Sequence, residues 1–273
     1  MSLRQVFSLV LLAATLGVLG TSTSARAQLF SRGDLFGPGA LPPMLSIEAG
    51  FGQHLQAGTY DCECGARFEG QKGNGFLANL MYELPLDYSW VLGLKGGVDF
   101  KKINGSEMKV EQGVYRFAYR DDSLSLENPS FDRTAEVNLT YLGVAPFVKY
   151  QFSRVGAFIQ MAPHIQFLVS SHLLHRRELL TTRFKDEQGI EHPIVFNNGE
   201  QFEVLEDYEV PNVKGMRLSL QLTAGYDLEL SDHSLIAPMI TYELPFTTVR
   251  DELANDWKIN SLFGSVAIKF RMD

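Results

Sequence analysis

Hydrophobic and polar residues alternate along eight segments of the chain, with the two-residue period that is typical of a β-strand. In the clearest case, residues 216–230, even positions such as Met216, Leu218 and Leu220 are apolar and odd positions such as Arg217 and Gln221 are polar. Successive side chains of a strand point to opposite faces, so each segment presents one apolar and one mixed face. The segments are 45–52, 76–84, 88–101, 142–152, 159–170, 216–230, 236–246 and 261–270.

The connections between these segments are alternately very short and very long. The short ones are residues 85–87, 152–154 and 231–233, whereas the long ones are 58–72, 102–133 and 176–214, with a shorter one at 250–256. A barrel in an outer membrane has tight periplasmic turns and large external loops. The sequence therefore predicts an all-β fold: an antiparallel transmembrane up-and-down β-barrel of about eight strands. Alternating stretches inside residues 102–133 predict that the third and fourth strands are prolonged as a hairpin above the membrane.

We expect the purely apolar face of each strand to meet lipid and the mixed face to line the interior. The interior then carries six acidic and six basic side chains, namely Glu48, Glu83, Asp99, Asp227, Glu229, Glu243, Lys95, Lys101, Lys149, Arg217, Lys269 and Arg271. Charges removed from water need partners, and side chains about fill the interior of an eight-stranded barrel. This balance predicts a filled, cross-braced lumen and not an open pore.

Two further features bear on the barrel prediction. Seven aromatic residues lie near the short-turn end, where they predict an aromatic belt at the membrane interface: Tyr82, Tyr88, Trp90, Tyr150, Phe152, Tyr226 and Phe270. Pro146, Pro163 and Pro238 fall inside predicted strands. Because proline cannot donate a ladder hydrogen bond, we expect bulges or bends at these three positions.

The beginning of the chain reads as a signal for export. Arg4 precedes an apolar stretch at residues 6–20, and Ala25-Arg26-Ala27 has the small-residue pattern of a cleavage site. The apolar stretch is short against the ~20 residues of a membrane helix, so a cleaved signal peptide at residues 1–27 is favoured over an anchor. We expect a flexible periplasmic lead-in at residues 28–43, a barrel at 44–273, and a place in a bacterial outer membrane.

Charge and cysteine content narrow the function classes. The chain has 24 Lys and Arg against 32 Asp and Glu, a formal net charge of −8, which argues against a nucleic-acid partner. Cys62 and Cys64 are separated by one residue, which leaves three alternatives: a strained disulfide, a link to another chain, or two metal ligands. A disulfide is favoured in an oxidising compartment. No EF-hand spacing is present, and we expect no cofactor.

Histidines recur on the fifth predicted strand and its exit. His164, His172 and His175, with Ser170 and Ser171 between them, raise the hypothesis of an outer-membrane acyltransferase or protease. Triads are recognised by geometry, and no spacing here specifies one. The favoured interpretation is that these are polar residues of the lumen and rim, and that the protein is not an enzyme.

The long connection at residues 176–214 is the strongest candidate for a binding surface. Acidic and aromatic residues are interspersed near its end: Phe196, Phe202, Glu203, Glu206, Asp207 and Tyr208. A solvated loop is one interpretation, and a protein-binding surface is the other, since long loops on rigid scaffolds often carry function.

The segment Asn138–Leu142, with Pro146 and the pair Lys149-Tyr150, resembles the PorT-like outer-membrane β-barrel proteins of the Bacteroidota. Residues 82–86, 225–228 and 261–270 fit the same pattern. The resemblance covers roughly residues 45–270 and implies an eight-stranded outer-membrane barrel without an active site. PorT itself is associated with type IX secretion.

Three hypotheses of function follow. The preferred one is a non-enzymatic barrel that contacts outer-membrane lipid and acts as a scaffold or subunit of an envelope complex, with external loops that bind another envelope protein. The first alternative is a narrow transporter for small or hydrophobic solutes. The second is an outer-membrane enzyme.

Overall fold

The computed structural model describes residues 42–272, except for 62–66, 112–113, 120–121, 128, 153–155, 181–182, 186–188, 190, 197–198 and 251–255. The expected signal peptide, nearly all of the expected lead-in, and Cys62 and Cys64 therefore lie outside the described residues. Sixteen strands are present in the described part of the chain.

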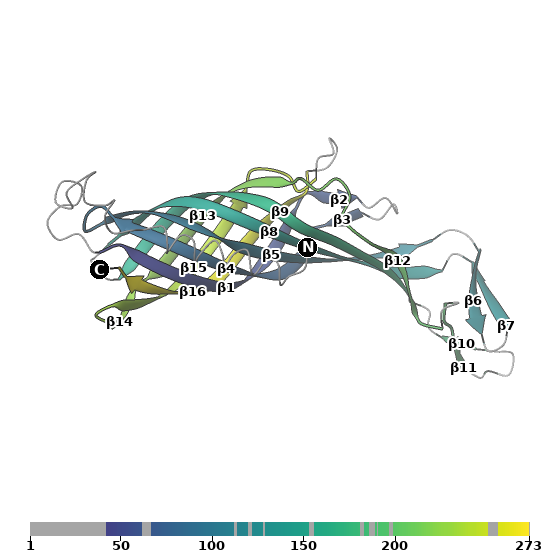
Figure 1. The fold of residues 1–273 in the computed structure, drawn as a ribbon. Coiled ribbons are helices and arrows are strands. Elements are labelled where there is room, and N and C mark those ends of the chain that lie inside the picture. Colours follow the sequence, from purple (N-terminus) through teal and green to yellow (C-terminus); the bar gives the residue numbers. More distant parts are fainter. Residues whose placement is uncertain are drawn as a thin grey trace.

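Eight of these strands form a closed ring (Figure 1). They are β1 (Met44–Ala57), β4 (Lys72–Pro85), β5 (Trp90–Val110), β8 (Ser130–Gln151), β9 (Ala157–Leu179), β13 (Met216–Tyr226), β15 (Ser234–Pro245) and β16 (Lys258–Arg271). Each pairs antiparallel with the next, and β16 pairs with β1 from Lys258↔Ala57 to Arg271↔Met44. The prediction of an eight-stranded antiparallel barrel is confirmed.

The faces of the wall are inverted relative to those of a soluble barrel. On β16 the outward side chains of Leu262, Val266 and Ile268 are each more than 40% exposed, whereas Ser261 and Lys269 on the inward face are each 1% exposed. The same alternation follows the other strands (burial patterns of β1, β4 and β15). The apolar outer band is the surface that contact with lipid requires. Closure of the ring meets a second requirement, because it leaves no unpaired strand edge in hydrocarbon. Among the described residues, no helix is long and apolar enough to cross a membrane.

Aromatic side chains gather at the short-turn end of the wall. The rings of Trp90 and Tyr150 lie edge to face with centroids 5.0 Å apart, and Tyr150 meets Phe152 in the same manner at 5.3 Å. Trp90 and Phe152 are 47% and 62% exposed. This arrangement is typical of a barrel's interfacial girdle.

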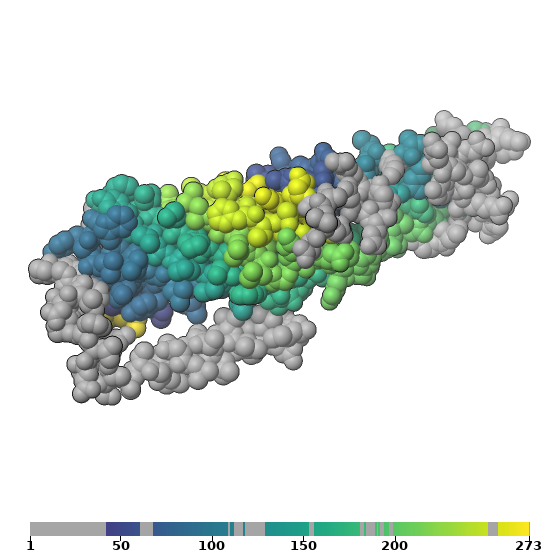
Figure 2. Space-filling view, turned by 90° about the horizontal axis from the view of Figure 1, so that it is seen from above, coloured from purple at the N-terminus to yellow at the C-terminus, as the bar shows by residue number. Residues whose placement is uncertain are grey.

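Three wall strands are much longer than the others. β5, β8 and β9 have 21 to 23 residues, whereas the other five have 11 to 14. The excess forms an open sheet, here called the arm, built from residues 104–110 of β5, 130–138 of β8, 172–179 of β9 and the returning strand β12 (Phe202–Tyr208). Figures 1 and 2 show the arm continuing beyond the barrel at the end opposite to β14 (Leu228–Ser231).

Small hairpins complete the long connections. β6 (Val114–Tyr119) pairs with β7 (Asp122–Glu127), β10 (Arg183–Lys185) with β11 (Glu191–Pro193), and β2 (Thr59–Asp61) with β3 (Arg67–Glu69). Residues 102–133 thus prolong β5 and β8, as the pattern indicated. Residues 176–214, in contrast, are not one long loop, because β9 continues to Leu179 and β12 returns along it.

Of the bulges or bends expected at the three prolines, bulges are absent from the ladders there. β8 pairs with β9 in one register on both sides of Pro146, at Val144↔Ile165 and Val148↔Met161, so the missing N–H removes ladder pairs without shifting the strands. The irregularity lies elsewhere, between Thr140 and Tyr141. Pro238 faces the junction at which the predicted strand 216–230 divides into β13 and β14, again in one register.

Candidate functional site

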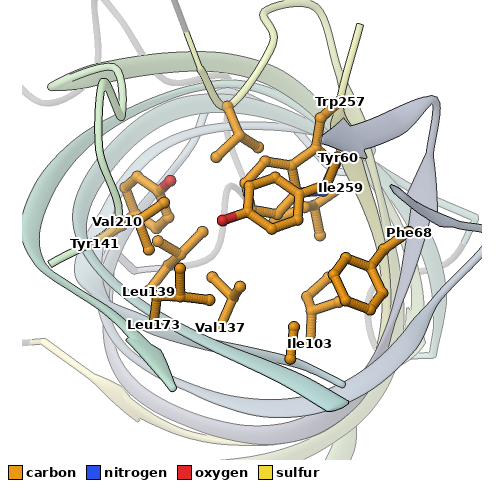
Figure 3. Close-up of a cluster of buried hydrophobic side chains, with 12 residues drawn as sticks. Tyr60, Phe68, Ile103, Val137, Leu139, Tyr141, Leu173, Val210, Trp257 and Ile259 are labelled. Atoms are coloured by element: carbon orange, nitrogen blue, oxygen red, sulfur yellow. The ribbon is translucent and has the colours of Figure 1, made fainter. Parts of the chain in front are cut away.

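The outer half of the lumen is closed by a hydrophobic cap (Figure 3). Tyr60 and Phe68 come from the β2–β3 hairpin, Trp257 from the approach to β16, and all three are at most 3% exposed. The ring centroids of Tyr60 and Trp257 are 4.8 Å apart. These side chains pack on apolar residues of the wall and of the base of the arm: Ile103, Ala135, Val137, Leu139, Tyr141, Leu173 and Ile259. The cap therefore seals the barrel below the arm.

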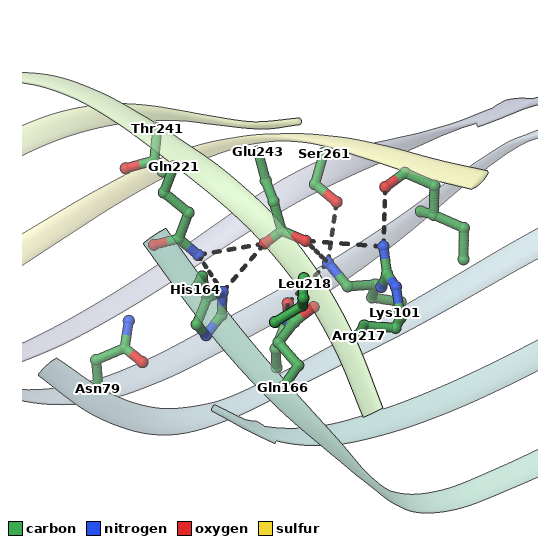
Figure 4. Close-up of polar contacts among 12 residues, drawn as sticks. Asn79, Lys101, His164, Gln166, Arg217, Leu218, Gln221, Thr241, Glu243 and Ser261 are labelled. Carbon is green, nitrogen blue, oxygen red and sulfur yellow. Dashed lines mark hydrogen bonds and ion pairs between the residues drawn. The ribbon is translucent and has the colours of Figure 1, made fainter. Parts of the chain in front are cut away.

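A polar network crosses the lumen below the cap (Figure 4). The ammonium of Lys101 lies 3.1 Å from a Glu243 oxygen, 2.7 Å from Asp99 and 3.0 Å from the Ser261 hydroxyl. The side-chain amide of Gln221 donates to the other Glu243 oxygen at 3.2 Å. These groups come from four different strands, so they brace the wall from side to side.

A compact charge cluster fills the inner half of the lumen. Lys149 contacts Glu83 at 3.0 Å and Asp227 at 2.9 Å, and Lys269 contacts the same two carboxylates at 2.7 Å and 2.9 Å. All four side chains are at most 2% exposed. Two ammonium groups and two carboxylates compensate each other, which is what charges removed from water require.

Ten of the twelve predicted lumen charges are buried: Glu48, Glu83, Lys95, Asp99, Lys101, Lys149, Arg217, Asp227, Glu243 and Lys269. Glu48 accepts hydrogen bonds from Asn79 at 2.8 Å and Ser265 at 2.7 Å. Glu229 and Arg271 are not in the lumen. They pair with each other at 2.9 Å with the Glu229 side chain 55% exposed, because β14 and the end of β16 project past the inner rim of the barrel.

His54 belongs to the central network but was missed in the sequence. Its Nδ1 lies 2.8 Å from the Ser261 hydroxyl, and the residue is fully buried. The alternation that places Gly50 and Gly52 on the inward face of β1 continues to His54, so a longer strand assignment would have found it.

The arm is held together by a second charge network. Arg133 pairs with Glu111, and Arg177 bridges Glu111 at 2.9 Å and Glu203. The Arg177 guanidinium also lies 4.9 Å from the centroid of Phe131. Beneath it, the inner face of the arm is covered by a cluster of Phe117, Phe131, Leu179, Ile194 and Phe196. The arm is thus a packed structure.

The six candidate partner residues are divided between two environments. Phe196 is 6% exposed inside the cluster of the arm, so it holds the fold of the arm. The other five lie on β12, with Glu203 bound to Arg177 and Asp207 bound to His172 at 2.8 Å. Phe202 and Tyr208 are 36% and 38% exposed.

The three histidines do not form one site. His164 contacts Gln221 at 2.8 Å and Glu243 at 3.6 Å inside the lumen. His172 is exposed on the arm, and His175 is buried 3.6 Å from Glu206. Burial, together with the charge of Arg133, lowers the pKa of His175 to about 4. Among the described residues, no group of three or more His, Cys, Asp or Glu side chains is arranged to hold a metal ion.

Solved structures similar to this chain include outer-membrane β-barrels. OprG from Pseudomonas aeruginosa is 11% identical with a TM-score of 0.37, covering 86% of this chain and 99% of that one. Neisserial surface protein A is 10% identical with a TM-score of 0.34, covering 86% and 100%. The outer membrane protease OmpT of Escherichia coli is 11% identical with a TM-score of 0.30, covering 90% and 99%. No protein-family model and no curated protein sequence matches the chain.

Proposed function

We propose that this protein is a non-enzymatic outer-membrane barrel whose closed body holds the arm outside the cell, where the arm binds another protein of the envelope. The short turns then face the periplasm and the arm faces outward, after export by the signal peptide at residues 1–27. The resemblance to PorT-like proteins supports a role in a secretion-related complex.

The observation that carries this proposal is the exposure of apolar side chains on the arm. Met108 is 77% exposed, Val110 58% and Val204 44%, beyond the outer apolar band of the wall. Lipid covers such side chains on the barrel, but water would surround them on the arm. These side chains lie on the two edge strands of the arm, Met108 and Val110 on β5 and Val204 on β12, and apolar side chains exposed on an edge strand are candidates for contact with another protein.

The interior supports this proposal over a transporter. A solute crossing the barrel would have to displace the cap, the Lys101–Glu243 network and the Lys149 cluster in turn. Each of the latter holds charges that are at most 7% exposed. Separating such pairs leaves uncompensated buried charge.

The same burial argues against an enzyme in the lumen. His54 and Ser261 lie within hydrogen-bond distance, but both are at most 1% exposed. On the arm, His172 is bound to Asp207, and His175 is enclosed. The enclosure of His54, Ser261 and His175 supports a binding role over chemistry at these three positions.

Site-specific photo-crosslinking in native membranes tests the proposal. A photoreactive amino acid at Met108 or Val204 should give a reproducible adduct with one protein. The same probe at Leu55, which is 42% exposed on β1 outside the arm, is the matched control. If neither arm position gave an adduct while both variants kept the folded gel mobility, the arm would not be a docking surface.

A further inference from the structure

A polar groove lies on the outer face of the arm, where the arm leaves the barrel. Its floor consists of two adjacent rows of side chains across three strands: Asn104, Glu136 and Leu174 in one row, and Ser106, Thr134 and Arg176 in the next. Gln71 closes it at the β4 side. The groove encloses about 360 Å³, which is the lower end of the size range of small-molecule sites.

The acidic groups at the groove are already compensated. Glu136 lies 2.7 Å from the ammonium of Lys102 and accepts a hydrogen bond from Asn138 at 2.9 Å. Burial acts to raise the pKa of Glu136, but Lys102, Asn138 and Arg176 outweigh it and hold the pKa below its ordinary value. Asp132, one row further out, accepts a hydrogen bond from Ser106 at 2.8 Å.

Three donors remain available in the groove. Within the described part of the chain, Arg176 has no carboxylate within 4.0 Å, and its one close contact is the Phe202 ring, 5.5 Å from the guanidinium carbon. The side chains of Asn104 and Thr134 have no hydrogen-bond partner among the described residues either. A guanidinium that has no ion pair within 4.0 Å among the described residues, beside a neutral amide and a hydroxyl, is suited to an oxyanion, which arginine binds in a bidentate manner.

The height of the groove above the wall indicates where such an oxyanion comes from. The outward apolar band ends at Leu142 on β8 and Phe167 on β9, and Phe100 on β5 is followed on the same face by Lys102. On the same face, Asn104 lies two rows beyond Phe100, and Arg176 lies four rows beyond Phe167. This is the level of polar headgroups and sugars at the surface of the outer leaflet.

We propose that the groove binds an anionic saccharide, with its phosphate or carboxylate on Arg176 and its hydroxyl groups on Asn104 and Thr134. The neutral amide and hydroxyl side chains match sugar hydroxyls, and Leu174 offers an apolar floor for a ring. The source is either the headgroup of an outer-leaflet glycolipid or a soluble acidic sugar. The saccharide site adjoins the docking position at Val204, which stands opposite Arg176 in the β9–β12 ladder, but it does not require a protein partner.

The full-length barrel, purified into phosphate-free detergent, allows a direct test. Glucose 1-phosphate, glucose and inorganic phosphate are titrated separately and followed by saturation-transfer NMR. A second experiment places the protein in nanodiscs with and without a phosphorylated glycolipid. Native mass spectrometry then measures how much glycolipid the protein retains. Folding of every variant is checked by heat-modifiable gel mobility. Arg176→Gln tests the oxyanion contact, and Asn104→Ala the sugar contact.

Arg183→Gln is the matched control, because Arg183 is an exposed arginine near the end of the arm that pairs with Glu191. We expect at least a tenfold loss of glucose 1-phosphate binding in Arg176→Gln and no change in Arg183→Gln. If the native protein retains the glycolipid in nanodiscs and Arg176→Gln does not, the site binds lipid. If only the soluble sugar phosphate binds, the site takes a free sugar. Three results would overturn the proposal. They are unchanged binding of glucose 1-phosphate by Arg176→Gln, equal binding of glucose and glucose 1-phosphate by the native protein, and no binding in either experiment.

Discussion

Pro146 on β8 stands directly opposite Pro163 on β9. Their places follow from the common register of Val144↔Ile165 and Val148↔Met161 on either side. Both side chains lie on the outward, exposed face. Because neither residue has an N–H, this pair can exchange no ladder hydrogen bonds, and β8 and β9 are joined here by packing alone.

The proline pair leads to a prediction about stability. Pro163→Val supplies one N–H opposite the Pro146 carbonyl, so the free energy of unfolding should rise by about 0.5–1.5 kcal/mol. Urea titration in lipid vesicles, followed by tryptophan fluorescence, measures this. Pro238→Val is the control at a different strand pair. A lower stability of Pro163→Val would mean that the fixed proline backbone matters more than the missing bond.

The inner charge cluster should be sensitive to removal of one member. Lys149→Met leaves Glu83 and Asp227 with Lys269 alone, and we expect the free energy of unfolding to fall by about 3–5 kcal/mol. The double variant Lys149→Met, Glu83→Gln removes one charge of each sign and should lose less than the sum of the single effects. Additive losses in the same urea titration would show that the four groups are not coupled.

The arm should loosen in acid because of His175. Its pKa of about 4 in the folded arm is below the unfolded value of about 6.5. Between these two pKa values the unfolded state therefore binds more protons than the folded arm. The contribution of His175 to the stability of the arm is complete above pH 6.5 and is lost as the pH falls towards 4. The facing groups are Arg133, Arg177, Glu111 and Glu206.

Hydrogen exchange of residues 172–179 across this pH range measures the effect. Opening of the arm should increase below pH 6.5 in the native protein. His175→Gln lacks the titrating group, so it should remove the pH dependence above pH 5 even if the arm is less stable at every pH. An equal pH dependence in both proteins would assign the acid response to carboxylates.

The lumen should not conduct ions, because three seals act in series: the cap, the Lys101–Glu243 network and the inner charge cluster of Lys149. In planar bilayers we expect no steady conductance from the native barrel, from a variant with Lys101, Arg217 and Glu243 all changed to Ser, or from Trp257→Ala. The cap still closes the first variant and the polar network the second. The combination of these two variants keeps the Lys149 cluster and should stay closed, so conductance should appear only when Lys149 and Lys269 are also changed to Ser. Steady conductance of the native barrel or of either partial variant would contradict the serial arrangement.

The wall was predictable from sequence because lipid and lumen impose opposite demands on alternate residues. β16 shows this well, since its inward residues between Ser261 and Lys269 are small or polar apart from Phe263, while the outward positions are largely apolar. The arm lacks that contrast. Its outward residues on β5 include Asn104 and Ser106, which meet water, so the pattern that marks a membrane strand fades before the strand ends at Val110.

Contacts between segments far apart in the sequence were the hardest feature to predict from the sequence. Nothing local in Phe196 indicates that it packs against Phe117 and Phe131, so an exposed loop position was expected instead. Likewise, the register of β12 along β9 depends on ion pairs such as Arg177–Glu203, whose members are 26 residues apart. The groove at Arg176 exists only once three strands are aligned, so no single segment carries its signature.

The pairing of β1 with β16 also constrains the order of assembly. One edge of residues 44–57 pairs with β4, but the other edge finds its partner only in residues 258–271, so that edge of the growing sheet stays open until the last strand arrives. Contacts of such large sequence separation make folding slow. The chain is therefore most exposed to wrong pairing and aggregation just before β16 closes the ring.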